Sequence, residues 1–92
     1  MLVSKEEYNE FKEDCKSRIY DLTNVYFSYH ISSDTMREFT VMLHTIYTML
    51  NTYEKNAHYV YFEDIKNALN SRITDLETYL RKSIVLSEQL TA

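Results

Sequence analysis

Apolar side chains recur every three or four residues along most of the chain. This spacing places them on one face of an α-helix, whose period is about 3.6 residues. The first run follows Ser4, which has the spacing of a capping box with Glu7, and it stops at the turn-favouring residues 32–34. We therefore expect a first helix over about residues 4–31. Its apolar face comprises Tyr8, Phe11, Cys15, Ile19, Leu22, Tyr26 and Tyr29.

The same spacing predicts a second helix over about residues 35–56. It opens near Thr35, with Glu38 as the capping-box partner. We expect it to end at residues 56–58, because Asn56 is the residue type that follows Gly in preference for a left-handed helix C-cap. Its apolar face comprises Met36, Phe39, Leu43, Ile46, Leu50 and Tyr53.

A third apolar run begins after this break. Residues 59–62 have the composition of a strand, but the chain offers no second strand signal for them to pair with. We therefore expect them to form the first turn of a third helix over about residues 59–88, fraying after Leu86. The apolar face of this helix comprises Phe62, Ile65, Leu69, Ile73, Leu76, Leu80 and Ile84.

The 92 residues include neither glycine nor proline. Average usage is about 7 % Gly and 5 % Pro, and tight hairpins depend on these residues. We therefore predict an all-α protein, with residues 1–92 forming a single domain, an up-down-up three-helix bundle. A bundle of this size has a thin core, so we expect either good packing or completion by dimerisation or by a partner.

Composition and charge also limit the expected setting. The net charge of -4 argues against a nucleic-acid partner, because phosphate binding requires a basic face. The start of the chain has no apolar secretory core, and Cys15 is the only cysteine, so we expect a cytoplasmic protein without disulfides. Ile, Lys, Asn and Tyr total 27 residues against 7 for Gly, Ala, Pro and Arg, which suggests an AT-rich genome, such as that of a low-GC bacterium or its phage.

The chain lacks the residue patterns that most catalytic sites require. Phosphate-binding loops and nucleophile elbows need glycine, and the chain has none. The histidines, His30, His44 and His58, lack the spacing of a metal site, and His44 lacks the nearby Lys and Gly of a phosphotransfer domain. Cys15 lies on an apolar face, where a thiol behaves as a small hydrophobe. We therefore expect no enzyme, no cofactor and no metal ion.

The second predicted helix has an unusual surface. Residues 39–53 contain no charged side chain, and the apolar arc is wider than one core-facing stripe requires. One interpretation makes this helix the central element, wedged between the other two. The alternative makes its outer side a contact surface for another chain, because interface cores are depleted in charge. The outer side comprises Val41, His44, Thr45, Thr48, Asn51 and Thr52. The segment is too short and too polar to span a bilayer, which requires about 20 apolar residues, so we expect no membrane partner.

Two further surface features leave alternatives open. Tyr20, Phe27 and Ile31 have helical spacing beside the first apolar face, so they either meet the third helix or form an exposed patch that binds a partner. Glu6, Glu10 and Asp14 form an acidic strip that either stabilises the helix N-terminus or docks to a basic partner. Lys12, Lys16 and Arg18 lie among these acids.

Aromatic and apolar side chains also gather by predicted position. Alternating helices would bring residues from all three helices together at one end of the bundle, namely Tyr8, Phe11, Tyr53, Tyr59, Tyr61 and Phe62. A second cluster would form at the other end from Tyr26, Phe27, Tyr29 and Phe39. On the third helix, an ambiguous set lies beside the core face: Tyr61, Ala68, Tyr79, Leu86 and Leu90.

The sequence therefore favours a non-enzymatic protein-binding module. Its partner-binding residues are expected among Tyr20, Phe27, Ile31, Val41, His44, Thr45, Thr48 and Thr52. We interpret it as a small inhibitor or modulator, encoded by a phage or mobile element, that masks a surface of a host protein. The alternatives are a self-associating structural or adaptor protein, which would form a homodimer, and a protein of the antitoxin or immunity type.

Overall fold

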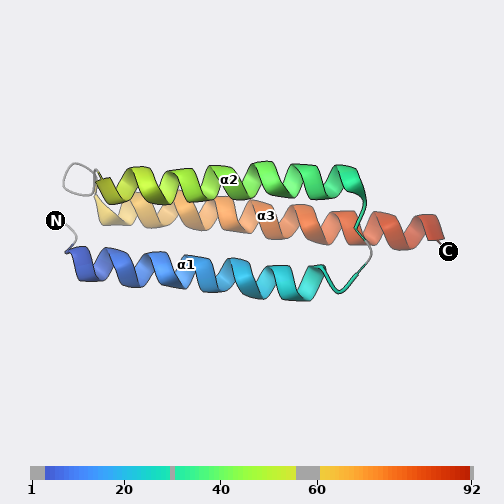
Figure 1. Ribbon diagram of the computed structural model, residues 1–92, viewed down its shortest axis with the longest axis horizontal. Coiled ribbons are helices and arrows are strands. Elements are labelled where there is room, and N and C mark those ends of the chain that lie inside the picture. Colours follow the sequence, from blue (N-terminus) through green and yellow to red (C-terminus); the bar gives the residue numbers. More distant parts are fainter. Residues whose placement is uncertain (1–3, 30, 56–60, 92) are drawn as a thin grey trace.

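The computed structural model consists of three α-helices that run up, down and up along a rod (Figure 1). They are α1 (Lys5–Tyr26), α2 (Ser33–Lys55) and α3 (Phe62–Thr91). The structure describes the backbone of residues 4–29, 31–55 and 61–91, and the side chains as far as residue 84. The predicted all-α three-helix bundle is confirmed, and no strand occurs in these segments.

The central helix of the bundle is α3. It packs closely against both α1 and α2, whereas α1 and α2 pack less closely against each other. Its apolar face is interrupted by no polar residue, and each core side chain on it is at most 1 % exposed. The interpretation that the second helix is central was wrong, because α1 packs more closely against α3 than against α2. The buried residues of α3 are Ile65, Leu69, Ile73, Leu76 and Leu80, and those of α2 are Phe39, Ile46 and Leu50.

The first helix ends at Tyr26, five residues earlier than expected. Its last turn is closed by Phe27, whose N–H donates to the Thr23 carbonyl at 2.9 Å, and the Ser28 hydroxyl donates to the Val25 carbonyl at 2.7 Å. The Phe27 ring packs edge-on against Phe39 of α2, with 4.9 Å between the ring centroids. The chain therefore leaves the helix where an aromatic contact with α2 and a serine hydroxyl both favour a turn.

The other helix ends differ from expectation by a few residues. The N-cap of α2 is Ser32, whose hydroxyl accepts from the Thr35 N–H at 3.1 Å, so this helix opens at Ser33 and not at Thr35. The expected cap at Ser4 is confirmed, since its hydroxyl accepts from the Glu7 N–H at 3.1 Å. The predicted break at residues 56–58, together with residues 59 and 60, lies outside the described segments.

The third helix starts later and ends later than predicted. It begins at Phe62, after Tyr61, whose carbonyl accepts from the Asp64 and Ile65 N–H groups. It does not fray after Leu86 but continues to Thr91. Its last turns extend beyond the connection between α1 and α2 (Figure 1).

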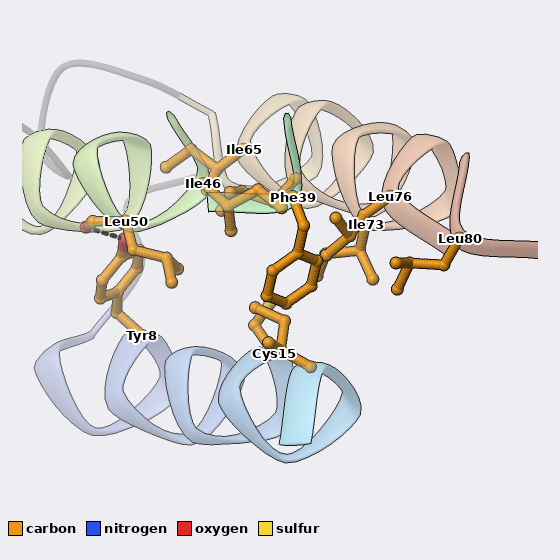
Figure 2. Packing of buried hydrophobic residues seen from close by; sticks show 11 residues of the cluster. Tyr8, Cys15, Phe39, Ile46, Leu50, Ile65, Ile73, Leu76 and Leu80 are labelled. Atoms are coloured by element: carbon orange, nitrogen blue, oxygen red, sulfur yellow. Dashed lines mark hydrogen bonds between the residues drawn. The ribbon is translucent and has the colours of Figure 1, made fainter. Parts of the chain in front are cut away.

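Aromatic side chains meet at both ends of the bundle, as the alternating helices predicted, but Tyr29 of the second predicted cluster is 49 % exposed. At one end Phe11 packs edge-on against Phe62, with 5.6 Å between centroids, and lies beside Tyr8 at 6.5 Å. The buried Tyr8 hydroxyl donates to the Leu50 carbonyl and so links α1 to α2 (Figure 2). Tyr61 was wrongly included in this cluster, because it precedes α3 and is 69 % exposed.

Candidate protein-interaction surfaces

The outer side of α2 is exposed and uncharged over about four turns. We call this surface the α2 outer face. It contains the five residues of α2 that were predicted to bind a partner, and two neighbours, Thr40 and Asn51. All of these side chains are exposed, and Val41 is exposed by 55 %. The predicted members are Val41, His44, Thr45, Thr48 and Thr52.

Threonine hydroxyls on this face bond to their own helix. The Thr40 hydroxyl donates to the Met36 carbonyl at 2.9 Å, and the Thr45 hydroxyl donates to the Val41 carbonyl at 3.1 Å. Because both hydroxyl protons are engaged, these side chains offer surrounding molecules an acceptor oxygen and a methyl group but no donor. The α2 outer face is therefore less polar than its threonine content suggests.

Charged residues begin only at the two ends of α2. Arg37 and Asp34 lie 3.9 Å apart in the first turns, and Lys55 ends the helix. From Val41 to Thr52 the uncharged stretch spans about 16 Å at 1.5 Å per residue. The face thus has an uncharged centre and charged ends.

The second predicted patch does not form a continuous helix face. Tyr20 lies on α1 and is 67 % exposed, whereas Phe27 and Ile31 lie beyond the end of α1. Phe27 is half-buried against Phe39, and Ile31 is also half-buried. These three residues therefore do not share one helix face.

The set beside the core face of α3 was also left open by the sequence. Ala68 and Tyr79 are half-buried, and Leu86 and Leu90 are outside the described side chains.

The lysines of α1 lie on a different side of the helix from three of its acids. At 100° per residue, Lys5, Lys12 and Lys16 fall within about 40° of one another. The basic row made by these lysines faces α2, because Lys12 Nζ lies 2.9 Å from Glu54 Oε2. The hydrogen bond from Lys12 and its positive charge hold the pKa of Glu54 below its usual value.

Acidic residues of α1 lie on the side away from this basic row. Glu10, Asp14 and Asp21 fall within about 40° of one another and roughly 120° to 200° from the lysines. We call these three residues the acidic row. Lys12 and Lys16 therefore do not interrupt this row, whereas Arg18 falls within about 40° of Asp14 and lies beside it.

An open groove of about 250 Å³ lies between α1 and α3. Sequence reasoning missed it, although Arg18, Leu22 and Val25 have the spacing of one helix face. Two cations on its border are engaged: Arg18 Nη1 donates to Asn70 Oδ1 at 2.6 Å, and Arg81 lies 2.9 Å from Glu77. The groove is lined by Arg18, Asp21, Leu22, Val25, Tyr26, Ile73 and Glu77.

Of the residues considered for catalysis, the structure describes His44 and Cys15, which lie on different helices. His44 is exposed on α2, and His30 and His58 lie outside the described segments. Cys15 is 1 % exposed, and burial raises the pKa of its thiol. Among the residues that the structure describes, no three His, Cys, Asp or Glu side chains gather as a metal site would require.

None of the helices, over the residues described, has a stretch apolar enough and long enough to cross a membrane. Comparisons of the chain with protein-family models, with curated proteins and with solved structures found no match.

Proposed function

We propose that this chain is a non-enzymatic protein-binding module and that the α2 outer face is its contact surface. The observation that supports the proposal is the exposed, uncharged centre of this face, from Val41 to Thr52. A solvated helix face is ordinarily charged or strongly polar. Burying uncharged side chains against a partner avoids the desolvation cost of burying ions.

The mechanism of such a module is steric. The bundle holds α2 as a straight, preformed helix, so binding requires little ordering of the backbone. A stoichiometric inhibitor or modulator of this kind, encoded by a phage or mobile element, acts by covering a functional surface of a protein in the host cytoplasm. The charged ends of α2, at Asp34 and Lys55, would form the polar rim around the contact.

A second candidate is self-association through the same face. Two copies that meet at an uncharged face avoid like-charge repulsion, although the whole chain carries a net charge of -4. A two-fold dimer would bury identical patches from both copies. This candidate uses the same residues but has no foreign target.

Affinity capture tests the proposal. The tagged chain is incubated with lysate of a low-GC bacterium, and the captured partner is then purified and titrated against wild-type and variant chains. Thr48→Glu places a charge at the centre of the face, and Asn24→Glu places one on the exposed outer side of α1. We expect Thr48→Glu to weaken binding by roughly tenfold or more and Asn24→Glu to leave it nearly unchanged.

The outcomes separate the two candidates. A partner bound stoichiometrically, and lost with Thr48→Glu, supports the module. A micromolar dimer in sedimentation that Thr48→Glu dissociates supports self-association instead. Recovery of no stoichiometric partner together with a monomer insensitive to either variant would contradict both candidates.

A further inference from the structure

We propose that the α2 outer face binds an α-helix of the partner protein, and that this helix runs antiparallel to α2. The inference rests on the proposed function, because it assigns the chemistry and the orientation of the partner at that same face. It follows from a stripe of short side chains with opposite charges at its two ends.

The stripe runs along the outer side of α2. Its members are spaced alternately four and three residues apart, which is the spacing of a seam between two packed helices. Every side chain in the stripe is exposed, so the bundle itself does not cover it. The stripe comprises Asp34, Glu38, Val41, Thr45, Thr48, Thr52 and Lys55.

The centre of the stripe fits a second helix. Val41, Thr45 and Thr48 are β-branched, so they have few rotamers to lose when a partner packs against them. They are also short, which allows another helix axis to approach within about 8 Å. A strand is a poorer fit, because it binds through free N–H and C=O groups, and those of a helix are already paired.

The N-terminal end of the stripe carries a net negative charge. Asp34, Arg37 and Glu38 sum to one negative charge. Arg37 lies 3.9 Å from Asp34, whereas Glu38 forms no ion pair within the described residues. This end therefore attracts a cationic side chain of a partner.

The C-terminal end carries the opposite charge. Lys55 ends α2 and forms no ion pair in the part of the chain that the structure describes. Its neighbour Glu54 is turned toward α1, where it lies 2.9 Å from Lys12. Lys55 is therefore available to an anionic side chain of a partner.

These end charges determine the orientation of the docked helix. Acidic residues stabilise the first turn of a helix and basic residues its last turn, because of the helix dipole. A helix of this ordinary kind, laid antiparallel to α2, places its basic turn beside Asp34 and Glu38 and its acidic turn beside Lys55. A parallel helix would bring like charges together at both ends.

Two synthetic peptides test the orientation. The first is a fluorescein-labelled helix of about six turns, with glutamates in its first turn, lysines in its last turn, and alanine and leucine along one face. The second has the same composition with the two charged turns exchanged. Fluorescence anisotropy measures the affinity of the full chain for each, and we expect the wild type to bind the first peptide more tightly.

A charge exchange within the chain provides the decisive comparison. Asp34→Lys with Lys55→Asp reverses the charge of both ends and keeps the net charge of -4. We expect this double variant to shift the ratio of the two affinities at least about fivefold toward the second peptide. Any difference in helicity between the peptides cancels in this comparison, because the same two peptides are used with both chains.

A matched control makes the same exchange elsewhere. Asp75→Lys with Lys82→Asp reverses two charges at exposed positions of α3 and also keeps the net charge. We expect it to change the ratio by less than about twofold. Circular dichroism of both double variants verifies that each remains helical.

Four results would overturn the inference. They are an unchanged ratio for the α2 double variant, an equal shift for the α3 control, no saturable binding of either peptide by the wild type, and a wild-type dimer that neither peptide displaces. The last result would assign the stripe to a second copy of the chain. A captured partner that is lost with Thr48→Glu, together with an unchanged ratio, would support the proposed function and overturn only the orientation.

Discussion

Tyr8 is the residue that most directly joins two helices in the core. Its side chain is 2 % exposed, and its hydroxyl donates to the Leu50 carbonyl of α2. Burial, with a smaller contribution from the Glu54 charge, raises the pKa of Tyr8 to about 12. The neutral hydroxyl is therefore part of the folded state.

We expect Tyr8→Phe to lower the free energy of unfolding at neutral pH by about 1 kcal/mol, because it removes one buried hydrogen bond while keeping the ring. The pH dependence gives a sharper result. Between pH 10 and about 12 the unfolded chain loses the Tyr8 proton and the folded chain keeps it, so the wild type should lose on the order of 2 to 3 kcal/mol as pH rises through this range.

Urea titrations of wild type and Tyr8→Phe at matched pH values measure this contribution. The lysines titrate in the same range in both proteins, so the difference between the two curves isolates Tyr8. A difference that stays constant from pH 8 to 12 would contradict the buried, protonated tyrosine.

Cys15 gives a second test at the residue scale. It is buried between α1 and the rest of the core, and burial raises its pKa. Because the thiolate is the reactive form, we expect a disulfide reagent to modify Cys15 orders of magnitude more slowly in the folded chain than in urea. Equal rates in both conditions would show that the thiol is accessible.

At the scale of the helices, spacing was sufficient to predict how many there are, their order and most of their buried faces. Tyr8, Cys15 and Ile19 all lie on the face predicted for α1. The end of α1 was not predictable from spacing, because it depends on the contact of Phe27 with Phe39, which are distant in sequence.

The candidate surfaces also include some that helical spacing could predict and some that it could not. The exposed position of Val41, His44 and Thr48 follows from the helical period of α2. The groove between α1 and α3 does not, because it depends on how closely two helices approach. The supposed face of Tyr20, Phe27 and Ile31 assumed a helix through residue 31, and α1 ends at Tyr26.

The cap of α2 can be tested with neighbouring serines. Ser32→Ala removes the hydroxyl that accepts from the Thr35 N–H, so it should lower the free energy of unfolding by about 1 kcal/mol. Ser33→Ala, at the first helical residue, is the matched control and should have little effect. Urea denaturation of both variants measures the difference, and a larger loss for Ser33→Ala would contradict the assigned cap.

Leucines of α3 and α1 differ in burial, so the same truncation to alanine should lower the free energy of unfolding by different amounts. Leu76 of α3 is fully buried, whereas Leu22 of α1 is half-buried beside the groove. We expect Leu76→Ala to cost about 2 to 5 kcal/mol and Leu22→Ala clearly less, because its site opens to solvent. Calorimetric unfolding of the two variants compares them directly. Equal costs would contradict the difference in burial between these two leucines.

As a whole the molecule is an elongated rod of 52 × 18 × 16 Å, with a radius of gyration of 15.3 Å. A compact globular domain of this length would have a radius of gyration of about 12 Å. The rod shape leaves each helix with an outer side that its two neighbours do not cover. On α2 that side is uncharged, whereas on α1 it carries carboxylates, because the lysines face α2. The uncharged outer side of α2 is the basis of the proposed contact surface.

The central claim is that another protein contacts the uncharged outer face of α2. Photocrosslinking tests it most directly: a benzoylphenylalanine replaces Thr48 in one variant and Asn24, on the exposed outer side of α1, in another. Both chains are expressed in a low-GC bacterium and irradiated. We predict a discrete crosslinked product from position 48 and little from position 24. A product from position 24 alone, or from neither position, would contradict the claim.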